Sequence, residues 1–157
     1  MSKQNNVVSL ILALSLMSVA GVAQAKFVKG MTAQQVSQEV TVRLMAGISL
    51  DGIANASHAA GLKSEQVASS LIQSGQNPAA VVAALIKVDP QAAGLITVAA
   101  LTMKPAQAAA ITTAAISAVP QQSRAIIAAA LTVPGVNPSD VLSASAAGGR
   151  EGQGEGR

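Results

Sequence analysis

Three consecutive segments of the chain share one pattern: PQAAGLITVAALTMK (90–104), PAQAAAITTAAISAV (105–119) and PQQSRAIIAAALTV (120–133). Aligned on their prolines, they place isoleucine at the seventh position, leucine or isoleucine at the twelfth, and a pair of alanines between these two positions. Agreement of these columns over three segments indicates an internal repeat. Each segment has the length of one helix of about three turns.

Proline explains why the repeat indicates separate helices. It fits the first helical position, where its missing N–H would have no partner, and it pushes the residue before it out of the α region. Asn77 and Asp89, which precede Pro78 and Pro90, are also residue types that cap a helix N-terminus. The pattern therefore predicts an array of short helices rather than one long helix.

Capping and stop signals predict further helices on both sides of the repeat. A capping box formed by Thr32 and Gln35 opens a helix that runs to about residue 46. The other predicted helices run from the caps Ser49 and Ser64 to the stops Gly61 and Gly75, and from Asn137-Pro138 onward. We therefore expect an all-α domain over residues 26–147, with seven or eight short helices in a solenoid-like array or a compact bundle.

One repeat unit cannot fold alone. It offers about two large aliphatic side chains, worth ~1.5–3 kcal/mol each when buried. Ordering a backbone of ~15 residues costs ~1–2 kcal/mol for each residue. Stacked units share their apolar faces, and alanines let helices approach closely, but the end units of a stack keep an uncovered face. We therefore expect another copy, a partner or a polar cap at the ends.

Residues 1–25 have the pattern of a cleavable secretory signal peptide. Lys3 precedes an apolar run over 7–22, and Ala23-Gln24-Ala25 is a small-x-small cleavage site. The alternative is an uncleaved anchor, but the run is shorter than the ~20 apolar residues that a spanning helix needs. We expect an exported chain that begins at Lys26.

The last ten residues, 148–157, differ in composition from the rest. They are glycine alternating with charged and polar residues, with no apolar side chain. Such a segment cannot offset its ordering entropy by burial, so we expect a flexible tail. A sorting or attachment tag is the alternative interpretation.

Composition excludes several classes of protein. The chain has no cysteine, so an exported form has no disulfide framework and no lipid-modified amino-terminal cysteine. Its formal net charge of +3 is spread along the chain, without the basic stripe and stacking aromatics that nucleic-acid binding requires. Phe27 is the single aromatic residue, and we expect it at the mature amino terminus rather than in the core.

No set of residues predicts catalysis or metal binding. Asp51, Ser57 and His58 supply the residue types of a hydrolase triad, but Ser57 and His58 are adjacent on one predicted helix and point about 100° apart. We therefore expect a solvent-facing histidine. One histidine without cysteine excludes the common zinc sites, and no glycine-rich phosphate loop precedes a helix. The expectation is a non-enzyme with no catalytic, cofactor-binding or metal site.

Membrane insertion is the main competing hypothesis. Segments 95–101 and 106–119 are rich in alanine, isoleucine and threonine. Charged residues at 87, 89, 104 and 124 nevertheless keep every apolar run of the mature chain below the ~18 residues of a spanning helix. β-rich self-assembly is also opposed, because alanines and regular prolines disrupt a cross-β register.

The motifs SLD (49–51), AAGL (59–62) and NPAAVV (77–82), followed by the proline-led units, resemble a group of small exported proteins. These are alanine-rich proteins of Gram-negative bacteria with proline-punctuated helical repeats and a glycine-rich tail. The resemblance implies an exported bacterial protein and carries over no activity, ligand or active site.

The sequence thus predicts an exported, non-enzymatic structural or interaction protein. Its expected partner is itself or another exported protein, in the periplasm, at the cell surface or in the extracellular matrix. The alternative is a membrane-active helical protein of the pore-forming or bacteriocin-like type.

Overall fold

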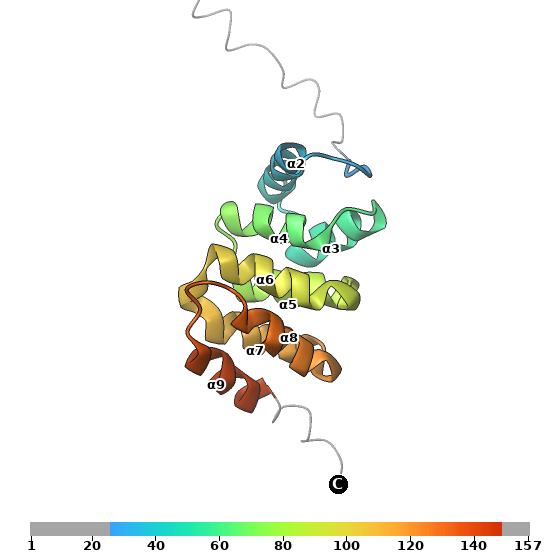
Figure 1. The fold of residues 1–157 in the computed structure, drawn as a ribbon. Helices are drawn as coiled ribbons and strands as arrows, with labels where there is room; N and C mark the ends of the chain where they lie inside the picture. The colour runs from blue at the N-terminus through green and yellow to red at the C-terminus, as the bar shows by residue number, and fades with distance from the viewer. Residues whose placement is uncertain (1–25, 149–157) are drawn as a thin grey trace, which may run out of the picture.

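The computed structural model describes residues 26–148, which form eight α-helices stacked along one axis (Figure 1). Their bounds are α2 Ala33–Met45, α3 Leu50–Ala59, α4 Ser64–Gln73, α5 Pro78–Val88, α6 Ala93–Met103, α7 Ala108–Ala118, α8 Ser123–Leu131 and α9 Pro138–Gly148. The prediction of an all-α fold with seven or eight short helices is confirmed. The predicted leader and tail residues 149–157 lie outside the described residues, and Gly148, expected to open the tail, ends α9.

The helices form two rows, because the most extensive contacts join helices two positions apart in the chain. α2, α4, α6 and α8 make the even row, and α3, α5, α7 and α9 make the odd row. Consecutive helices from α3 to α9 also touch across the rows. Figure 1 shows the resulting elongated stack, with α2 at one end and α9 at the other. The solenoid-like alternative is therefore the observed arrangement.

Three of the predicted amino-terminal caps are present. Thr32 and Gln35 form the capping box of α2, each side chain accepting from the backbone N–H of the other residue. The side chains of Ser49 and Asn77 accept from the N–H three residues further on, at the starts of α3 and α5. Each bond satisfies an N–H that has no partner within the helix.

The predicted caps Ser64 and Asp89 are wrong, because these two residues bond to each other instead. The Ser64 hydroxyl donates to Oδ2 of Asp89 at 2.6 Å, which ties the start of α4 to the end of α5. Asp89 precedes Pro90 and has φ −136° and ψ 71°. Pro90 opens a 3₁₀ turn, η1 (Pro90–Ala92), so the α-helix begins only at Ala93, beyond the reach of Asp89.

The same 3₁₀ turn recurs at the next two repeat prolines, as η2 (Pro105–Gln107) and η3 (Pro120–Gln122). The proline-led units were predicted to be helical from their first residue, and the structure corrects this to a 3₁₀ turn followed by an α-helix. The first two turns also contact residues further along the chain. The Gln122 side chain donates to the carbonyl of Pro90 at 2.9 Å, and Gly135 lies against Pro105.

Each helix has one central apolar residue that is fully buried. These residues are Val36, Ile53, Val67, Val81, Ile96, Ile111, Ile126 and Val141, and each has 0% of its surface exposed. Residues one and five positions later lie beside the central one on a helix. In α5, α6 and α7 they are also buried, for example Val82 and Ile86 in α5. The core is therefore a continuous double line of small and medium aliphatic side chains.

One buried threonine of this core has a hydroxyl group without a hydrogen-bond partner. Thr112 in α7 is fully buried, and its Oγ1 has no hydrogen-bond partner. Thr97, the equivalent residue of α6, is equally buried, but its hydroxyl donates to the carbonyl of Ala93 at 2.7 Å. A buried hydroxyl without a partner lowers the stability of the folded state.

We therefore expect Thr112→Val to raise the free energy of unfolding by about 1 kcal/mol, because valine keeps the shape and removes the unpaired hydroxyl. The matched Thr97→Val variant loses a hydrogen bond as well as a hydroxyl and should gain clearly less. Urea denaturation of both variants followed by circular dichroism measures the difference. An equal gain in both variants would contradict the conclusion that the unpaired hydroxyl of Thr112 lowers stability.

Candidate functional site

The residue types of a hydrolase triad do not form an active site. The Ser57 side chain is buried, and its hydroxyl donates to the carbonyl of Ala54 at 3.0 Å. His58 and Asp51 are exposed to solvent. The expected solvent-facing histidine is confirmed.

The described residues offer no cluster of metal-ligating side chains. Within residues 26–148, no three side chains of the metal-ligating types histidine, cysteine, aspartate and glutamate come together. No helix in this part of the chain is long and apolar enough to span a lipid bilayer. The two ends of the stack differ from its interior in what they bury and expose.

Phe27 anchors the chain at the amino-terminal end of the stack. Only 3% of its surface is exposed, so the expectation that it lies outside the core is wrong. The physical reason is that α3 has no earlier helix of the odd row beside it among residues 26–148. Segment 26–31 lies at this end instead, and its aromatic ring supplies part of the missing apolar cover.

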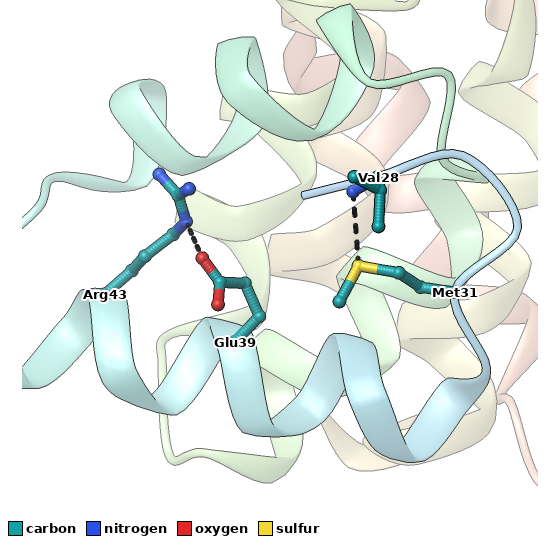
Figure 2. Close-up of polar contacts among 4 residues, drawn as sticks. All are labelled: Val28, Met31, Glu39 and Arg43. Carbon is teal, nitrogen blue, oxygen red and sulfur yellow. Dashed lines mark hydrogen bonds and ion pairs between the residues drawn. The ribbon is translucent and has the colours of Figure 1, made fainter. Parts of the chain in front are cut away.

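A partly buried ion pair lies next to this ring. Nε of Arg43 is 2.7 Å from Oε1 of Glu39, and the two side chains are one helical turn apart on α2 (Figure 2). The Glu39 side chain is 2% exposed and the Arg43 side chain 20%. The guanidinium also lies over the Phe27 ring, 4.5 Å from its centroid. Arg43 therefore joins the buried carboxylate to the amino-terminal segment through a charge pair and a cation–π contact.

The segment itself is held by a short turn. The N–H of Val28 contacts Sδ of Met31 at 3.3 Å (Figure 2). The N–H of Met31 also donates to the carbonyl of Val28. Gly30 has φ +85°, a conformation that favours glycine. The turn directs the chain from Phe27 into the capping box of α2.

A hollow of about 620 Å³ lies between this segment, α2 and α3. Its apolar wall is formed by alanines on α3 together with Phe27 and Val28, and its cationic groups come from two lysines and Arg43. The lining residues are Lys26, Phe27, Val28, Lys29, Arg43, Ala56, Ala59 and Ala60. We call it the amino-terminal hollow. It suits an apolar group that is accompanied by negative charge.

The opposite end of the stack exposes residues whose equivalents are buried. Leu142, one position after the central Val141 of α9, is 56% exposed, whereas its equivalents Val82 and Thr112 are 0% exposed. In α8, Leu131 is 45% exposed, whereas its equivalent Leu101 in α6 is fully buried. Since α8 and α9 have no later row neighbour in residues 26–148, these positions must face the next helix of the row. We call the positions one and five residues after a central residue the forward face.

The opposite side of each helix, which we call the backward face, carries alanine three positions after the central residue in α3 and in α5 to α9, whereas α2 has Glu39 there and α4 has Ser70. Ala129, three positions after the central Ile126 of α8, faces the earlier helix α6, because a β-carbon placed on Gly94 would lie 3.8 Å from its Cβ. Ala84 and Ala144 have the same position in α5 and α9, and both are buried. In α3 this position is Ala56, which lines the amino-terminal hollow. The hollow thus lies over the backward face of the odd row, which segment 26–31 covers only in part.

Sequence reasoning predicted uncovered ends but not the residues that form them. Glu39 and Arg43 have the spacing of a helical ion pair, and Phe27 is the single aromatic residue, so both signals were present in the sequence.

Comparisons with known protein families, with curated proteins and with solved structures found no match.

We expect Arg43→Ala to lower the free energy of unfolding by about 2 kcal/mol, because it leaves the Glu39 carboxylate buried without this partner. Combining it with Glu39→Gln removes the buried charge, so the double variant should be more stable than Arg43→Ala alone. A urea-denaturation double-mutant cycle measures the coupling. A double variant less stable than Arg43→Ala would contradict the role of the buried charge.

Proposed function

We propose that this chain is an exported, non-enzymatic structural or interaction protein that associates with itself or with another exported protein. The cell surface or the extracellular matrix is the proposed location. The signal-peptide pattern of residues 1–25 supports export.

The observation that carries this proposal is the exposure of forward-face leucines at the end of a repeating stack. A solenoid that functions as a monomer normally ends in a helix with a polar outer face. Here Leu131 and Leu142 occupy positions that are buried in the interior of the same stack. Exposed apolar side chains in such a position favour contact with another surface.

The chemistry of the described residues supports a role without catalysis. The hydroxyl of Ser57 is engaged with the backbone, and His58 stands apart from any group of ligating side chains in residues 26–148.

The test is fractionation of Gram-negative cells that produce the full chain into medium, sheared surface material, periplasm and membranes. The intact mass of the recovered species is measured, and cross-linking in cells precedes lysis. We expect a chain cleaved after Ala25, outside the cytoplasm, and cross-linked to itself or to one exported protein. The double variant Leu12→Arg/Leu14→Arg, which interrupts the apolar leader run, is the matched control and should stay in the cytoplasm.

Two outcomes would overturn the proposal. An uncleaved cytoplasmic chain would remove export. A chain retained in membranes after a high-salt wash, and able to release dye from liposomes, would support the membrane-active alternative instead.

A further inference from the structure

Segment 26–31, which we call the amino-terminal strap, is fixed to both rows of the stack. The ring of Phe27 is 3% exposed and belongs to the hydrophobic core, and its centroid lies 4.5 Å from Cζ of Arg43 on α2. The stem of Lys29 lies beside the turn that follows α3, because a β-carbon placed on Gly61 would be 3.9 Å from its Cγ and Cδ. The strap is therefore part of the folded body.

A turn inside the strap connects the buried ring directly to α2. The N–H of Met31 donates to the carbonyl of Val28, and the Met31 side chain packs against the core. The next residue, Thr32, forms the capping box of α2. Little free chain therefore separates Phe27 from the first helix.

The predicted leader cleavage site lies next to this anchor in the sequence. Cleavage after Ala25 breaks the peptide bond to Lys26, which is the single residue between that bond and Phe27. One residue of extended chain spans at most ~3.6 Å. A peptidase cuts where the backbone is exposed and flexible, because the chain on both sides of the bond must enter its cleft. While the Phe27 ring is in the core, the chain after this bond cannot do so.

We propose that docking of Phe27 sets the order of two events: the leader is removed first, and the strap closes on the body afterwards. Hydrolysis adds water across the bond and leaves a carboxylate on Ala25 and an amino group on Lys26, with the catalytic groups supplied by the cell's signal peptidase. A body that folds first protects its own leader and keeps the apolar run over 7–22 attached. The inference rests on the proposed export and specifies how leader removal and folding are coupled.

The size of the expected protection follows from what opening the strap exposes. When opening and closing are fast relative to cleavage, the cleavage rate is proportional to the fraction of molecules that are open. Opening returns the Phe27 ring to water and removes its contact with the Arg43 guanidinium. We expect the closed strap to slow cleavage roughly 30-fold, which corresponds to about 2 kcal/mol at 1.4 kcal/mol for each factor of ten.

The experiment follows cleavage of the folded full-length chain by purified bacterial signal peptidase in mild detergent. Phe27→Ala removes the anchor, and Val28→Ala is the matched control, because the Val28 side chain is 56% exposed. A third variant carries Gly-Ser-Gly-Ser inserted between Lys26 and Phe27, which keeps the docked residues and moves the bond away from the body. Far-UV circular dichroism verifies each fold. Synthetic peptides of residues 18–31 with the same changes give the cleavage rates without the body.

Each rate is divided by that of the matching peptide, which removes the peptidase's own preference for residues near the bond. The wild-type chain and Val28→Ala should then be cut roughly 30-fold more slowly than Phe27→Ala and the inserted chain. The inserted chain carries the test alone if Phe27→Ala does not fold, because it leaves every residue of the core in place.

Three outcomes would overturn the inference. Equal corrected rates for all four folded chains would show that the closed strap does not protect the bond, and the proposed function would stand. Protection that the insertion does not relieve would show that the closeness of the docked ring is not the obstacle, and the proposed function would again stand. Chains and peptides that all remain uncut would overturn both the inference and the proposed export.

Discussion

Packing between helices two positions apart in the chain is the interaction on which the whole structure depends. The helices are nine to thirteen residues long, and helices of this length are marginal in water on their own. Their side chains are mostly alanine, valine, isoleucine and leucine, so no single helix buries much apolar surface. Each inner helix therefore needs a row neighbour on both sides and a helix of the other row across the core. Alanines on the backward face make this possible, because they let the larger forward-face residues of the earlier helix approach.

Local signals in the sequence were sufficient to predict the helices but not their order in space. The capping box at Thr32 and the caps at Ser49 and Asn77 act within one turn, so their sequence patterns are reliable. Ser64 and Asp89 are also typical capping residues, but they bond to each other across 25 residues of sequence. A local pattern cannot predict this bond, because it forms only when α4 and α5 pack together. The repeat also did not distinguish a stack from a bundle, since that choice depends on which helices become row neighbours.

The end surfaces illustrate the same limit. The need for cover at the ends follows from the repeat alone. Inside the stack, neighbouring units cover each other's apolar faces, whereas a unit at the end has no neighbour to cover its outer face. The particular cover at the amino end does not follow, since it depends on how segment 26–31 turns back over α2 and α3. Phe27 becomes buried through that turn, and Glu39 becomes buried beneath it, although a glutamate in the middle of an amphipathic helix is ordinarily solvated.

The position of the described chain ends has a mechanical consequence. Segment 26–31 and helix α9 lie at opposite ends of the stack (Figure 1). A force that pulls the two ends apart therefore passes through the row contacts in series, because the main contacts within residues 26–148 join only helices that are one or two positions apart in the chain. Each helix pair is held mainly by its nearest neighbours, so such a body yields by peeling from an end, in steps the length of one repeat, rather than by rupturing at once. Under tension the molecule would behave as an extensible link, whose compliance grows with the number of units that it contains.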